Sequence, residues 1–171
     1  MRTCWTVSSV ALCLLWTPAA AGAQETPHFD ARPVLDCLAA AGTMPERRAC
    51  IGAAASACMN DDLGYTTVGM GYCYDQERGL WDVWLNAAYG RLMEREKAYD
   101  AEMTSAGVTA PSAAAALREM QRACIPYRDA ACDYERSRWG NGTGAGPATL
   151  ACLMQHTGEQ ALALDARMAP Q

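Results

Sequence analysis

Cysteine is the residue type with the most distinctive chemistry in this chain. The 171 residues contain nine cysteines but only two histidines, His28 and His156, and no C-x-x-C pair. Zinc sites usually combine closely spaced cysteines with histidines, and covalent haem attachment needs C-x-x-C-H. The cysteines therefore predict disulfide bonds and no metal site, and we expect no cofactor.

A second set of residues is polar and lies beside apolar helical stripes. It consists of Asp82, Asn86, Gln121, Arg128 and Asp129. Polar groups at such positions need hydrogen-bonding partners, so the set is either a buried network that fixes helix packing or a surface that contacts a partner. We expect Asp82 and Asn86 to meet Arg128, because their helices should form an antiparallel pair.

The sequence predicts no enzymatic activity. It contains no G-x-S-x-G or comparable nucleophile motif. Two carboxylates brought together by the fold could still hydrolyse a glycan. A peptidoglycan hydrolase is therefore kept as a minor alternative.

The N-terminal segment predicts export. Met1 and Arg2 give a positive start, an apolar run reaches Trp16, and Ala21-Gly22-Ala23 forms an A-x-A cleavage site. We expect residues 1–23 to be a signal peptide cut near Ala23, which makes the mature protein periplasmic or secreted. The apolar run is too short for a permanent membrane span, and none is expected in the mature chain.

The mature chain is acidic and has an odd number of cysteines. The full sequence carries a net charge of −5, and removal of Arg2 leaves about −6. This charge argues against nucleic acid as a partner and favours a cationic protein. Loss of Cys4 and Cys13 leaves seven cysteines, so at least one thiol is free or pairs between chains.

Apolar periodicity predicts an all-α fold, a disulfide-stapled helical bundle. Residues 24–57 form a leader and a short helical hairpin, whose second helix begins after Thr43 and ends at Cys58. A long central helix over 68–101 follows, capped by Thr66 or Thr67. Its core-facing stripe consists of Trp81, Trp84, Leu85, Ala88 and Leu92.

Two further helices complete the predicted bundle. The first opens at Pro111 and Ser112 and contains Pro126, where we expect a kink or a break. The last spans about 148–168. Residues 141–147, NGTGAGP, are predicted to form the loop between them.

Several motifs in this chain resemble one known family. They are Thr66-Thr67-x-x-Met70-x-x-Cys73, Trp81-Asp82-x-x-Leu85-Asn86-x-x-Tyr89, Gln121-Arg122-Ala123-x-Ile125-x-Tyr127-Arg128-Asp129-x-x-Cys132, and Gly142-Thr143 followed by Cys152 and Thr157. Over about residues 58–164 the chain resembles the lysozyme-inhibitor LprI-like N-terminal domain family of small exported bacterial proteins. The resemblance implies a compact, disulfide-stapled helical domain, here 58–171, and for some members inhibition of lysozyme. The chain departs from the family at Cys124, where a tryptophan is usual, and at Gln160, where an arginine is frequent.

Cysteines that are neighbours in the chain, on helices joined by short connections, predict three disulfides. The expected pairs are Cys37–Cys50, Cys58–Cys73 and Cys132–Cys152. Cys124, which replaces the family tryptophan on an apolar stripe, is expected to be the free thiol.

The leading functional hypothesis is an exported protein-binding protein that inhibits a lysozyme-type muramidase. The resemblance suggests the target, and an acidic chain would be steered towards the generally cationic lysozymes of hosts. The alternative is an envelope assembly or stress factor that binds other periplasmic proteins without inhibiting lysozyme.

A protruding segment is needed to block a muramidase cleft, and one loop is the candidate. It runs from Trp139 to Pro147, includes Asn141, Gly142 and Thr143, and is flanked by Cys132 and Cys152. The simpler alternative is a plain connection between two helices.

Overall fold

All regular secondary structure in residues 25–169, the part of the chain that the computed structural model describes, is α-helical. The predicted signal peptide lies outside the described residues. Six helices follow one another: α1 (Arg32–Ala40), α2 (Met44–Ala49), α3 (Ala53–Cys58), α4 (Thr67–Ser105), α5 (Ala113–Ser137) and α6 (Ala145–Ala166). The predicted all-α fold is confirmed.

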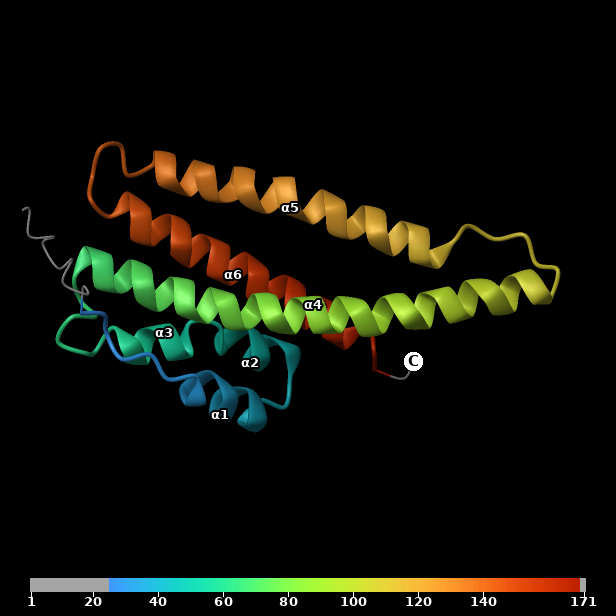
Figure 1. Ribbon diagram of the computed structural model, residues 1–171, viewed down its shortest axis with the longest axis horizontal. Coiled ribbons are helices and arrows are strands. Elements are labelled where there is room, and N and C mark those ends of the chain that lie inside the picture. Colours follow the sequence, from blue (N-terminus) through green and yellow to red (C-terminus); the bar gives the residue numbers. More distant parts are fainter. Residues whose placement is uncertain (1–24, 170–171) are drawn as a thin grey trace, which may run out of the picture.

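Helix α4 is the axis of the molecule (Figure 1). It has 39 residues. Helix α5 runs back along it, α6 runs in the direction of α4 again beside both, and α1–α3 pack at the end where α4 begins. Helix α6 makes the most extensive contact with α4, and α5 packs more on α6 than on α4. None of the helices described here combines the length and the apolar character needed to cross a bilayer.

The expected stripe of α4 forms the core. Trp81 and Leu92 are almost completely buried, and Trp81 shares one apolar cluster with Val34 of α1 and Ala54 of α3. A second cluster joins Ala88 and Leu92 to residues of α5 and α6. The short N-terminal helices therefore share the core of the longer ones.

Side-chain caps fix where the helices begin. The Thr66 hydroxyl accepts a hydrogen bond from the backbone N–H of Gly69 at 2.9 Å, which settles the choice between Thr66 and Thr67. Thr43 and Glu46 form a capping box at the start of α2. Ser112 accepts from the N–H of Ala115 at the start of α5.

The prediction that the second half of the N-terminal hairpin is one continuous helix is wrong. This segment divides into α2 and α3, because Gly52 adopts φ = 97° at the N-cap of α3. Only glycine enters this region of φ at little cost, so the chain can turn there. The turn lets the first N–H groups of α3 point at α4.

Of the kink or break predicted at Pro126, the break is wrong, because α5 continues through this residue from Ala113 to Ser137. Proline removes the hydrogen bond that its N–H would donate to the carbonyl of Arg122. Both residues are exposed, so water can satisfy that carbonyl.

Three disulfides connect consecutive helices, and they are the three predicted pairs. Their sulfurs join Cys37 to Cys50, Cys58 to Cys73 and Cys132 to Cys152. Cys124 is the free cysteine of the described residues and is half-buried on α5.

Asp100 connects the C-terminal part of α4 to the start of α5 through hydrogen bonds. Its carboxylate accepts hydrogen bonds from the Ser112 hydroxyl at 2.6 Å and from the N–H groups of Ala113 at 2.8 Å and Ala114 at 3.1 Å. The hydrogen bond from the Ser112 hydroxyl, followed by those from the two N–H groups, lowers the pKa of this carboxyl below its usual value.

The lowered pKa predicts an acid-dependent contribution to stability. A carboxyl with a depressed folded-state pKa stabilises the fold above its unfolded-state pKa of about 3.9, and this contribution is lost as the pH falls through the folded-state value. We expect Asp100→Asn to lower the melting temperature at pH 7, and its difference from wild type to shrink below about pH 4. Melting curves across this range, with exposed Glu102→Gln as the control, test it; a difference that does not change with pH would contradict it.

Candidate functional site

Four of the five polar residues singled out in the sequence, all except Asp129, line one cavity. It has a volume of about 400 Å³ and lies between α4, α5 and α6. Helix α4 supplies Asp82 and Asn86, α5 supplies Gln121 and Arg128, and α6 supplies Thr157. The fold thus brings together polar side chains that are up to 75 positions apart in the sequence. We call this space the polar cavity.

The hydrogen bonds in the polar cavity differ from those expected. Asn86 donates to Asp82 at 3.1 Å, one turn away on the same helix. Arg128 donates to its neighbour Asp129 at 2.9 and 2.8 Å. The predicted contact of Asp82 and Asn86 with Arg128 is therefore wrong.

Helix packing explains this difference. Because α5 packs more on α6 than on α4, the polar stripes of α4 and α5 face each other across the cavity without touching. A hydrogen bond links α5 to α6 instead, because the side-chain amide of Gln160 on α6 donates to that of Gln121 on α5 at 2.7 Å. Asp82, Asn86 and Asp129 are exposed, so they do not form a buried network.

The remaining walls give the polar cavity a mixed character. Arg48 and Glu159 add one charge of each sign, and Cys124, Ile125 and Tyr127 add apolar and aromatic surface. The cavity can therefore offer both hydrogen-bond donors and acceptors beside an apolar wall. Such a lining suits a polar side chain or a short segment of a partner.

The other motif residues have structural positions. Thr66 caps α4, and Thr67 is the first residue of that helix and is exposed. Tyr89 is half-buried and packs against the second apolar cluster, away from the polar cavity.

His156 lies beside a disulfide near the cavity. Its ring nitrogen and the sulfurs of Cys132 and Cys152 lie within 4.8 Å of one another. Both sulfurs are bonded to each other, whereas metals bind thiolates. In this oxidised form the trio does not provide a metal site. The imidazole packs edge-on against Tyr127 instead, with ring centroids 5.8 Å apart.

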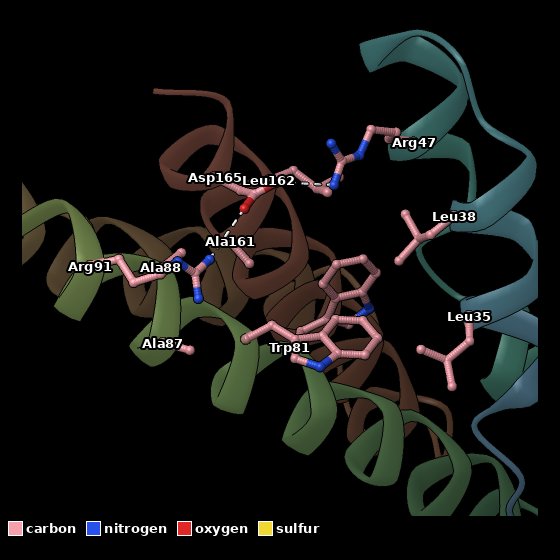
Figure 2. Close-up of a pocket in the computed structure, with 11 residues that line it drawn as sticks. Leu35, Leu38, Arg47, Trp81, Ala87, Ala88, Arg91, Ala161, Leu162 and Asp165 are labelled. Carbon is pink, nitrogen blue, oxygen red and sulfur yellow. Dashed lines mark hydrogen bonds and ion pairs between the residues drawn. The ribbon is translucent and has the colours of Figure 1, made fainter. Parts of the chain in front are cut away.

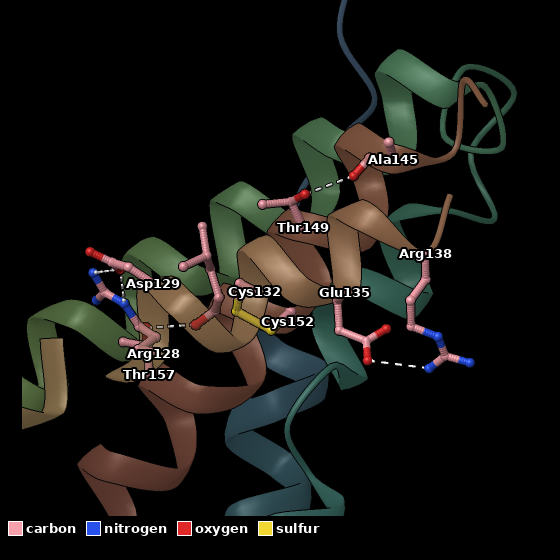
Figure 3. The surroundings of a disulfide bond; sticks show 10 residues. Arg128, Asp129, Cys132, Glu135, Arg138, Ala145, Thr149, Cys152 and Thr157 are labelled. Atoms are coloured by element: carbon pink, nitrogen blue, oxygen red, sulfur yellow. Dashed lines mark hydrogen bonds and ion pairs between the residues drawn. A yellow bond between two sulfur atoms is a disulfide. The ribbon is translucent and has the colours of Figure 1, made fainter. Parts of the chain in front are cut away.

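The same disulfide joins α5 to α6 below the candidate loop, seven positions before Trp139 and five positions after Pro147 (Figure 3). Trp139 follows α5 and lies over Gly144, where an added Cβ would come within 2.3 Å of the indole ring. The N–H of Gly142 donates to the carbonyl of Trp139 at 2.9 Å, and Gly140 has φ = 54°. The loop is therefore a compact turn with defined hydrogen bonds, and Asn141 and Thr143 are exposed on it. The predicted extent of the loop to Pro147 is wrong, because α6 begins at Ala145.

Exposed aromatic side chains lead along α5 to this loop. Tyr127 is 68% exposed and Tyr134 is 65% exposed, and the two are seven residues apart on one face of the helix. Trp139 follows in the turn and is 51% exposed. We call these three residues the aromatic row.

Glu77, which the sequence patterns did not single out, is completely buried. One carboxylate oxygen accepts from the N–H of Gly52 at 2.7 Å and from the indole N–H of Trp81 at 2.9 Å. The other oxygen accepts from the N–H of Ala55 at 2.7 Å. Its spacing could have indicated that it is buried, because Cys73, Glu77 and Trp81 follow one another at four-residue steps on one helical face.

Comparison with known proteins identifies relatives of the chain. A family model described as "Lysozyme inhibitor LprI" matches residues 58–164. A protein of Rhodobacter capsulatus, described as "Uncharacterized 17.7 kDa protein in puhA 5'region", is 27% identical over 132 residues, which cover 77% of this chain and 82% of the relative. No solved structure matches the chain.

Proposed function

Because the chain belongs to the LprI lysozyme-inhibitor family, we propose that it is an exported protein that binds another protein, with a lysozyme-type muramidase as its target. Three disulfides support a location outside the cytoplasm, where such bonds persist. The negative net charge of −5 would speed encounter with a cationic enzyme.

The aromatic row is the observation that carries the proposal. Tyrosine and tryptophan are enriched at protein interfaces relative to the rest of the surface. Here they are held on a rigid helix and on a turn whose base is closed by the Cys132–Cys152 disulfide. Rigid aromatic groups lose little conformational entropy on binding, which favours affinity.

The proposed contact places the turn from Trp139 to Gly144 in the substrate cleft of the muramidase, with α5 against its rim. Trp139 would enter the cleft, and Asn141 and Thr143 would supply polar contacts. Tyr127 and Tyr134 would bind beside it. Inhibition then follows from steric exclusion of the glycan and needs no chemistry by the inhibitor.

A hydrolytic function has less support. It would require a substrate-accessible carboxyl with a raised pKa. The one carboxyl buried completely within residues 25–169 is Glu77, and three N–H donors already enclose it.

Trp139→Ala tests the proposed contact. Hot-spot aromatics contribute at least about 2 kcal/mol, so we expect the inhibition constant for a cationic lysozyme to rise about 30-fold. Tyr65→Ala is the matched control, because Tyr65 is 72% exposed and lies before α4. Lysis of a cell-wall suspension measures both variants at two salt concentrations.

The possible outcomes separate the hypotheses. Full inhibition by Trp139→Ala would remove the turn from the contact surface. No inhibition by the wild-type protein would contradict the muramidase target and leave the envelope-factor alternative, for which a periplasmic pull-down is the next test.

A further inference from the structure

A second cavity, separate from the polar one, lies between the N-terminal helices and the bundle (Figure 2). Its volume is about 280 Å³, and its walls are mainly apolar. Leu35 and Leu38 of α1 face Trp81 and Trp84 of α4, whose rings pack edge to face with centroids 4.9 Å apart. We call it the tryptophan cavity.

One end of the tryptophan cavity carries two arginines and a single acid. Asp165 accepts from Arg47 at 3.1 Å and from Arg91 at 3.3 Å. Two guanidinium groups thus share one carboxylate, which leaves one positive charge uncompensated within the lining. In addition, the Nε–H of Arg47 is buried and has no hydrogen-bond partner among the described residues.

Part of the wall of the tryptophan cavity lies outside the residues that the family model matches. Helices α1 and α2 precede residues 58–164, which the family model matches, and Asp165 follows them. The cavity therefore exists because the additional N-terminal helices are fastened against α4 and α6. Family membership alone does not account for it.

We propose that the tryptophan cavity binds the carboxylate and chain of a medium-length fatty acid. The apolar chain would lie between the leucines and the indoles, and the carboxylate would accept hydrogen bonds from the unoccupied donors of Arg47 and Arg91. A single negative charge matches the one uncompensated positive charge, whereas a dianionic phosphate would leave a net negative charge. Guanidinium groups suit planar carboxylates because they donate two parallel hydrogen bonds.

The cavity volume limits the length of the chain. Ligand cavities in proteins usually measure about 300–1,000 Å³, so this cavity is at the lower end. It accommodates a short or medium acyl chain better than the two long chains of a phospholipid. The proposal does not depend on lysozyme binding.

Calorimetric titration of decanoate, kept below its micelle concentration, tests the proposal with the purified protein. We expect saturable binding with one site. Decanol lacks the charge and should bind at least about tenfold more weakly, and Arg91→Gln should weaken decanoate binding to a similar extent. Ala87→Phe should weaken binding, because Ala87 is an exposed residue of the cavity wall and a phenyl ring there would narrow the entrance.

Two control variants distinguish binding inside the tryptophan cavity from nonspecific binding at the protein surface. Arg118→Gln and Ala98→Phe change exposed residues of α5 and α4 that do not line the cavity, so binding should stay within about twofold of wild type. Absence of saturable binding, equal affinity for decanol, or unchanged binding by Ala87→Phe would overturn the proposal. Tighter binding of a leucine-ending peptide, lost on C-terminal amidation, would also overturn it and identify a protein tail as the ligand.

Discussion

Glu77→Ala is expected to destabilise the protein by about 3–5 kcal/mol. The side chain is 0% exposed and accepts three hydrogen bonds at 2.7–2.9 Å. Removing it leaves the N–H groups of Gly52 and Ala55 and the Trp81 indole without acceptors, at a cost of about 1–3 kcal/mol for each buried group. It also leaves a cavity beside Trp81.

Glu77→Gln should lie between Glu77→Ala and the wild-type protein in stability. One amide oxygen can still accept from Gly52 and Trp81, but the amide NH₂ would then face the N–H of Ala55. Urea unfolding followed by circular dichroism measures both variants, with Gln76→Ala, an exposed neighbour on α4, as the control. A loss below about 1 kcal/mol for Glu77→Ala would show that water or repacking satisfies these donors.

The role of Glu77 could not be predicted because it depends on the turn at Gly52. Sequence periodicity places Glu77 on the buried face of α4, but an acid there has no evident partner within its own helix other than Trp81. Its backbone partners become available only when Gly52 adopts a positive φ and turns the first N–H groups of α3 towards α4. If residues 43–58 are interpreted as one helix, the N–H groups of Gly52 and Ala55 donate within that helix and are not expected to reach Glu77.

Local patterns predicted most of the fold. The caps at Thr43 and Thr66 depend on hydrogen bonds within one turn, and the disulfide pairs join cysteines only 13, 15 and 20 positions apart. The course of α5 at Pro126 was less predictable, because it depends on whether the Arg122 carbonyl reaches water.

The polar cavity could be predicted only in part. Helical periodicity correctly placed Asp82, Asn86, Gln121 and Arg128 on facing surfaces. Whether facing groups touch depends on how closely α4 and α5 approach, and α6 holds them apart. The tryptophan cavity was not predicted at all, since the fold brings Leu35 and Leu38 against Trp81, which is at least 43 positions away in the sequence.

Two disulfides of similar loop length allow stability and binding to be separated. Replacing Cys132 and Cys152 by alanine is expected to cost about 3 kcal/mol, and the same change at Cys58 and Cys73 about as much, because the closed loops span 20 and 15 positions. Both double variants should carry Cys124→Ser, since a free thiol can exchange with the remaining disulfides.

The two variants should differ in inhibition, although they lose similar stability. Without Cys132–Cys152, α5 and α6 are no longer joined at the base of the turn that carries Trp139, so the aromatic group must be ordered on binding. We expect inhibition of a cationic lysozyme to weaken by about tenfold or more in this variant, and by less than about twofold when Cys58–Cys73 is removed. Assays are made at a temperature where circular dichroism shows both variants to be folded. Equal inhibition by the two would mean that the disulfide at the turn contributes only to stability, and that the contact with the target lies elsewhere on the molecule.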